Sequence, residues 1–161
     1  MGTQYENIED DFSRLKEKYP GLEMIHAITN PTAVGFVMAD TYKDFPKDIQ
    51  EQYSLRIKIE YPQNFPSSTI KVYDIDNRIK WDKIPYEHWH INADGALCTH
   101  HYREIARVKP VNRSFLVVYN ALALFYAYKH YLKTHQWILP DLPHGNAAIK
   151  VLNQESLAKR K

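Results

Sequence analysis

The sequence predicts an α+β fold, and three observations carry that prediction. An amphipathic helical pattern opens the chain, four short apolar runs follow at hairpin spacing, and a long apolar helix comes after an irregular segment. Strands joined by short connections pair as an antiparallel meander, and the helices before and after them pack on the resulting sheet.

The first helix is expected over residues 5–19, YENIEDDFSRLKEKY. Ile8, Phe12 and Leu15 fall on one helical face, while charged side chains cover the other. Pro20 and Gly21 then end the helix.

Four strands are expected around residues 23–29, 32–40, 54–61 and 68–75. The third, SLRIKIEY, is the clearest, because Leu55, Ile57 and Ile59 alternate with charged residues. A period of two indicates a strand with one buried face. A polar connector, TYKDFPKDIQEQ (41–52), separates the second strand from the third.

Residues 74–110 show neither the periodicity of a helix nor that of a strand. A loop of this length inside a compact domain is usually functional. Order returns with a helix over 115–135, FLVVYNALALFYAYKHYLKTH, which is apolar on most sides and which Ser114 is expected to cap. A proline-rich turn, LPDLPHG (139–145), and a short basic C-terminal helix over 147–161 complete the prediction.

Composition limits the classes of function. With 161 residues, 44% of them hydrophobic, residues 1–161 are expected to form a single domain with its own core. A net charge of +2 gives no electrostatic case for a nucleic-acid partner. No signal peptide is predicted, and polar residues interrupt the long helix, so we expect no membrane span. The single cysteine fits a reducing compartment, and a cytoplasmic location is expected.

The stretch HWHINADGALCTHH, residues 88–101, holds four of the eight histidines and the only cysteine. One interpretation is zinc, bound by His88, His90, Cys98 and one of the two histidines at 100 and 101, although the spacing is not that of a zinc knuckle or ribbon. A second is a nucleophilic thiol for acyl transfer. A third is a buried structural cysteine, which composition alone favours.

The order of the motifs resembles the ubiquitin-conjugating (UBC-like) enzymes. That family has His-Pro-Asn-Ile, then a short turn ending in Gly-x, an aliphatic residue and the catalytic cysteine. Here His88-Trp89-His90-Ile91, the turn NADGAL and Cys98, ten positions after His88, keep that register. YPQNFP (61–66) resembles the family's aromatic-proline corner, and VKP (108–110) resembles the Trp-x-Pro before its central helix. The resemblance extends from the first helix to about His144.

The chain also departs from that family. Trp89 replaces the proline of the family motif, and His90 replaces the asparagine that stabilises the oxyanion there. After the cysteine, Thr99-His100-His101 replaces the family's Leu-Asp. The spacing on both sides of the motif differs as well.

The resemblance implies a role for each candidate residue. Cys98 is the expected acyl-carrying nucleophile. His90 is expected to be an oxyanion donor or general base, with loop packing as the alternative. His88 is expected to order the loop through hydrogen bonds.

Three weaker expectations complete the site. His100 or His101 is expected to tune the pKa of the thiol, with at most one of them facing it. Asp141 and His144 are candidates for a gate on the acceptor side, against an ordinary turn. Trp81, Tyr86 and Trp89 form either a groove for an extended tail or the local core.

The implied activity is that of a cysteine-dependent transferase without metal or cofactor. It resembles divergent bacterial members found in antiphage (CBASS-like) operons. The implied partners are a ubiquitin-like protein or the C-terminus of a cGAS-like nucleotidyltransferase. Two routes to loading stay open, an activating enzyme or direct reaction of Cys98 with the partner. Two alternatives stay open: a non-catalytic UBC-like binding module, and a His/Cys zinc site with hydrolase activity.

Overall fold

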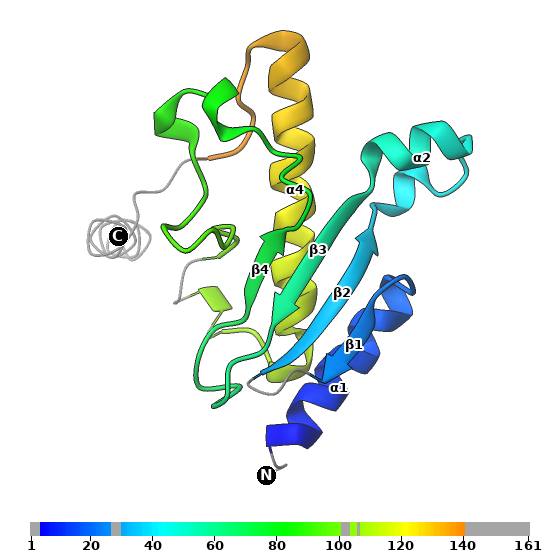
Figure 1. The fold of residues 1–161 in the computed structure, drawn as a ribbon, viewed down its shortest axis with the longest axis vertical. Helices are drawn as coiled ribbons and strands as arrows, with labels where there is room; N and C mark the ends of the chain where they lie inside the picture. Colours follow the sequence, from blue (N-terminus) through cyan, green and yellow to red (C-terminus); the bar gives the residue numbers. More distant parts are fainter. Residues whose placement is uncertain (1–3, 27–29, 101–103, 106, 141–161) are drawn as a thin grey trace, which may run out of the picture.

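The computed structural model describes residues 4–26, 30–100, 104–105 and 107–140. Helix α1 (Gln4–Lys18) leads into a four-stranded sheet, and the long helix α4 (Arg113–Thr134) runs behind that sheet in the view of Figure 1. The predicted α+β class is therefore confirmed, with an N-terminal helix, a sheet and a long helix after it. The short helix expected over 147–161 lies outside the described residues.

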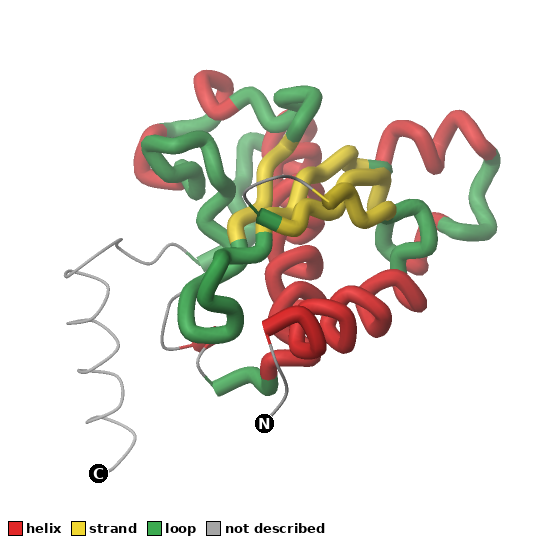
Figure 2. The backbone as a smooth tube through the Cα atoms, turned by 60° about the horizontal axis from the view of Figure 1, so that its bottom comes forward, coloured by secondary structure: helices red, strands yellow, loops and turns green. Residues whose placement is uncertain are grey.

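The sheet is an antiparallel meander in the order β1-β2-β3-β4, as predicted. Its strands are β1 (Glu23–His26), β2 (Pro31–Val37), β3 (Leu55–Glu60) and β4 (Lys71–Asp74). The alternation in β3 has the expected consequence, because the side chains of Leu55, Ile57 and Ile59 are fully buried. Figure 2 shows the strands as one layer with α1 and α4 on one side of it, while α2 lies beyond the end of the sheet.

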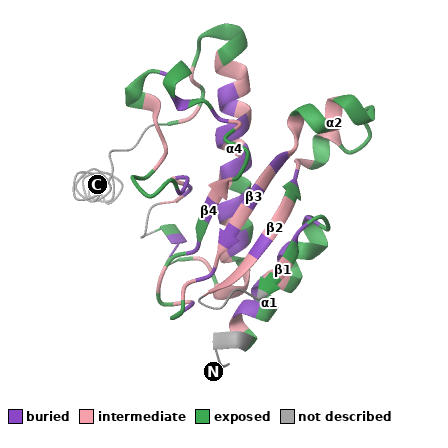
Figure 3. Cartoon of the chain, in the orientation of Figure 1, coloured by how far each residue is buried: buried purple, intermediate pink, exposed green. Residues whose placement is uncertain are grey.

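Helix α4 is buried along most of its length, which explains its nearly continuous apolar sequence. Its inward residues, such as Val117, Ala121 and Leu124, join the core formed by β3 and α1. Figure 3 shows this buried stripe along α4, in contrast to the exposed surface of α2.

The N-terminus of α4 is capped by a residue from α1, so the prediction that Ser114 caps it is wrong. The helix begins at Arg113, and the side chain of Asn112 at the N-cap position makes no capping hydrogen bond. Instead, the Ser114 amide donates to Oδ1 of Asp11 at 3.1 Å. The Tyr61 hydroxyl donates to the other carboxylate oxygen at 2.6 Å.

Asp11 is itself fully buried. Burial raises the pKa of its carboxyl, and the hydrogen bonds from Ser114 and Tyr61 partly offset that rise. A carboxylate beside the first amides of a helix satisfies donors that have no partner within the helix. This contact ties α1, α4 and the connection after β3 together.

The polar connector after β2 contains a helix that periodicity did not indicate. Helix α2 (Lys47–Tyr53) has no buried residue, so it carries no apolar stripe to read in the sequence. Arg78 holds its C-terminal end, because the guanidinium donates to the carbonyl oxygens of Gln52 and Ser54. Tyr53 stacks on Tyr42 with ring centroids 4.1 Å apart.

No helix within the described residues is long and apolar enough to cross a membrane.

Replacing Asp11 with alanine removes the acceptor of two buried donors, the Ser114 amide and the Tyr61 hydroxyl. We expect the free energy of unfolding to fall by about 2–6 kcal/mol, since each of the two unsatisfied buried donors costs about 1–3 kcal/mol. Urea unfolding followed by circular dichroism measures this loss. Asp10→Ala is the matched control, because Asp10 is the exposed neighbour on the same helix. Equal stability of the two variants would contradict the capping role of Asp11.

Candidate active site at Cys98

Residues 90–98 form a tight hydrogen-bonded turn that ends at the cysteine. Ile91 and Leu97 form an antiparallel bridge. The Cys98 amide donates to the His90 carbonyl at 2.7 Å, and the Asn92 amide donates to the Ala96 carbonyl at 2.8 Å. The backbone from Ala96 to Cys98 is therefore fixed relative to His90.

The tip of the turn requires a glycine. Gly95 has φ of 89°, a left-handed conformation that side chains other than glycine rarely adopt. Asp94 accepts from the Ala96 amide at 3.0 Å and pairs with Nζ of Lys71 at 2.7 Å. The hydrogen bond from Lys71 lowers the pKa of the Asp94 carboxyl. Because this pair is exposed, its main effect is to set the position of the turn beside β4.

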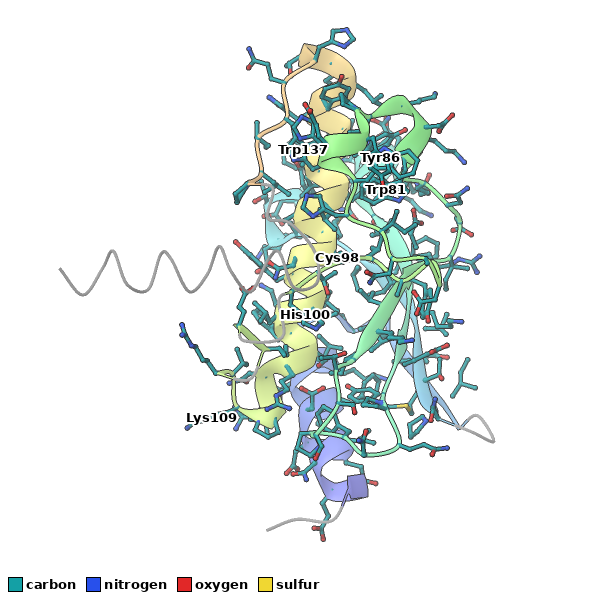
Figure 4. The ribbon with its side chains drawn as sticks, turned by 90° about the vertical axis from the view of Figure 1, so that its left-hand side faces the viewer. Trp81, Tyr86, Cys98, His100, Lys109 and Trp137 are labelled. Atoms are coloured by element: carbon teal, nitrogen blue, oxygen red, sulfur yellow. The ribbon has the colours of Figure 1, made fainter. Side chains whose placement is uncertain are left out.

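The turn is also joined to the edge of β4, where the Leu97 amide donates to the Val72 carbonyl at 2.8 Å. Leu97 and Thr99 are buried, and Cys98 between them is half-buried. On the other side, Nδ2 of Asn120 in α4 donates to the Thr99 carbonyl at 2.6 Å. Cys98 is thus held between the sheet edge and α4, and Figure 4 shows it midway along that helix.

The Cys98 thiol is in its neutral form at pH 7. Burial of the thiol raises its pKa above the ordinary value. Because the thiolate is the nucleophilic form, the resting thiol is a weak nucleophile toward unactivated reagents.

The three described histidines of the motif occupy two separate parts of this site. His88 and His90 both lie against the ring of Trp137, with centroid distances of 5.4 and 5.9 Å and interplanar angles of 19° and 16°. His100 instead places its Nδ1 3.0 Å from Oγ1 of Thr99. The tuning of the thiol by His100 stays a prediction.

Three candidate residues, His101, Asp141 and His144, lie outside the described residues. The zinc set is only partly described for the same reason. Within the described ranges, no three His, Cys, Asp or Glu side chains converge in a group able to hold a metal ion. His88, His90, Cys98 and His100 therefore do not form such a group among themselves.

The aromatic residues before the motif divide between core and surface. Trp81 is buried, and Trp89 packs against the core with its Nε1 donating to the Ile84 carbonyl at 2.9 Å. Tyr86, in contrast, is 81% exposed and lies against Trp89 at a centroid distance of 5.2 Å. The two tryptophans thus belong to the local core, and Tyr86 alone offers a surface.

Sequence reasoning missed two residues of this site, Asn120 and Trp137. Asn120 had a signal, since an amide within an otherwise apolar helix is expected to have a hydrogen-bonding partner. Trp137 had none, because its contacts with His88 and His90 join segments about fifty residues apart.

The chain matches no family model and no curated protein.

Alkylation of Cys98 by iodoacetamide tests the raised pKa. The rate is expected to rise with pH through a midpoint above about 8.5, the ordinary thiol value. The sign follows from the thiolate being the reactive form, which is lost as pH falls below the pKa. The same chain in urea is the control and should titrate near the ordinary value. A midpoint in the folded protein at or below the urea value would contradict the burial of the thiol.

Asn120→Ala removes the donor that holds the Thr99 carbonyl. We expect a loss of about 1–3 kcal/mol in the free energy of unfolding. We also expect faster alkylation of Cys98 at pH 7, because the residue next to the thiol loses its anchor on α4. Tyr119→Ala is the matched control, since Tyr119 lies beside Asn120 on α4 and is 61% exposed. An alkylation rate equal to that of the control would show that Asn120 does not hold the site.

Proposed function

We propose that this chain is a UBC-like acyl carrier in which Cys98 forms a thioester with the C-terminus of a partner protein and passes it to an amine. One observation carries the proposal: the Cys98 thiol lies between two buried residues at the end of an ordered turn, held by a sheet edge and by α4. The order of helix, four-stranded meander, long irregular segment and long helix agrees with the family that the motifs resemble.

The proposed loading step exchanges one acyl bond for another. The partner's C-terminal carbonyl arrives activated, as a thioester on an activating enzyme or as an acyl adenylate. Cys98 loses its proton to a base, and Sγ bonds to the carbonyl carbon. The tetrahedral intermediate then expels the thiolate or AMP. In the discharge step an amine nitrogen attacks the same carbon and the C–S bond breaks. The nitrogen loses one proton as the amide forms, and a proton returns to the Cys98 thiolate.

In this mechanism the two motif histidines have different roles. The His90 side chain donates a hydrogen bond to the oxyanion formed in discharge. The support for this role is that the backbone of His90 is held beside Cys98, because the His90 carbonyl accepts a hydrogen bond from the Cys98 amide at 2.7 Å. His88 orders the loop, as its stacking on Trp137 supports.

The raised pKa of the Cys98 thiol is useful to a carrier. A thiolate of higher pKa is a poorer leaving group, which slows attack on its thioester by water and by amines alike, so discharge depends on groups that place the amine and stabilise the oxyanion. The same property makes the resting thiol selective for strongly activated carbonyls.

The partner in this proposal is a ubiquitin-like protein or the C-terminus of a cGAS-like nucleotidyltransferase, in the cytoplasm of a bacterium and in antiviral defence. The support for this part is the resemblance of the His88-to-Cys98 motif to divergent bacterial conjugating enzymes.

The raised thiol pKa also favours a second candidate, a non-catalytic UBC-like module that binds a partner without forming a bond to it. The two functions differ in one observable. The carrier forms a covalent adduct in the presence of its activating system, and the binding module forms only a dissociable complex.

Intact mass spectrometry of the protein co-expressed with its operon neighbours, without reductant, distinguishes them. We expect an adduct on the wild type that thiol reagents remove, and a thiol-resistant ester on Cys98→Ser. Cys98→Ala is the matched control and should carry neither while keeping its thermal stability. An adduct of the same mass on Cys98→Ala would exclude Cys98 as the carrier, and a non-covalent complex alone would favour the binding module.

A further inference from the structure

The chain turns back immediately after α4 and places Trp137 on the active-site loop. His135 adopts the left-handed conformation with φ of 58°, and its amide donates to the Tyr131 carbonyl at 2.8 Å. The Gln136 amide then donates to Oγ1 of Thr134 at 3.2 Å. The reversal is thus built from defined contacts, and it carries the next residue, Trp137, to the segment that precedes the cysteine. Figure 4 shows Trp137 toward the same end of α4 as Tyr86.

Residues 88–90 present alternate sides to two different neighbours. Trp89 faces the core, where its Nε1 binds the Ile84 carbonyl. His88 and His90 both lie nearly parallel to the Trp137 ring, at 5.4 and 5.9 Å. His88 ends the 3-10 helix Tyr86–His88 and Trp89 after it is extended, and with this backbone one indole contacts both imidazoles at once. Trp137 thereby contacts this segment on the side that the core leaves open.

The same segment holds the nucleophile, because the His90 carbonyl accepts the Cys98 amide. We propose that Trp137 is a positioning residue: by stacking on His88 and His90 it fixes the backbone that holds Cys98 and the orientation of the His90 ring. The effect on the backbone stands on geometry alone, whereas the effect on discharge rests on the proposed function.

The neighbouring residue provides a matched comparison. Ile138 follows Trp137 on the same segment but is 58% exposed, and Trp137 is partly buried against the core. A side-chain deletion at 138 therefore changes the segment without removing the ring. Trp137→Phe keeps an aromatic ring, and Trp137→Ala removes it.

Amide hydrogen exchange measured by NMR tests the backbone effect. In Trp137→Ala the Cys98 amide is expected to exchange about five- to a hundredfold faster than in the wild type, because two ring pairs, each worth about 0.5–1.5 kcal/mol, are lost. Trp137→Phe should restore most of the protection, and Ile138→Ala should match the wild type. An unchanged rate in Trp137→Ala would overturn the proposal. Exchange that rises equally at every amide, in both Trp137→Phe and Trp137→Ala, would show that Trp137 only stabilises the fold as a whole. That result would also overturn the positioning role.

Thioester discharge tests the effect on His90 through a double-mutant cycle. Trp137→Ala is expected to slow discharge about three- to tenfold in the wild-type background and to add nothing in His90→Ala, because a residue that acts through His90 has no effect once the ring is gone. Ile138→Ala, the exposed neighbour of Trp137, should leave discharge unchanged in both backgrounds. Equal slowing by Trp137→Ala in the two backgrounds would show that Trp137 acts independently of His90 and would overturn its positioning role.

The two readouts separate this inference from the proposed function. If the wild type forms no thioester, the proposed function fails, and the exchange rate of the Cys98 amide still decides the role of Trp137. If the thioester forms and Trp137→Ala changes neither readout, the carrier function stands and the positioning role fails.

Discussion

The buried carboxylate of Asp11 fixes where α4 lies, and the rest of the structure depends on that helix. A helix that packs across a sheet can slide along its axis, because apolar contacts are not directional. A hydrogen-bonded cap at its first turn is directional, and here it comes from α1, 103 residues away in the chain. The Tyr61 hydroxyl on the second carboxylate oxygen adds the connection after β3 to the same point.

Two contacts near the active site follow from that placement. Asn120 lies about two turns into α4 and holds the carbonyl of the residue after Cys98. Trp137 follows the end of α4 and lies against the residues before Cys98. The cysteine is therefore held on both sides by groups whose positions derive from one helix, while the edge of β4 holds the turn between them. An arrangement of this kind gives a thiol in a fixed position, and burial raises its pKa.

The features that the sequence predicted are those set by local periodicity. The alternation of Leu55, Ile57 and Ile59 predicted a half-buried strand, and the buried residues of β3 confirm it. The capping of α4 was predicted wrongly, because a serine next to a helix start is a local signal whereas Asp11 acts across the fold. Helix α2 was missed since it has no buried face, and Trp137 was missed because tertiary contact alone brings it to His88.

The proposed function requires that Cys98 carries an acyl group. The most direct measurement is peptide mapping of the adduct under non-reducing, mildly acidic conditions, with tandem mass spectrometry to locate the bond. The account predicts that the C-terminal residue of the cargo is joined to the peptide containing Cys98 through a bond that hydroxylamine cleaves. Attachment at a lysine of this chain, in a form that hydroxylamine does not cleave, would contradict it.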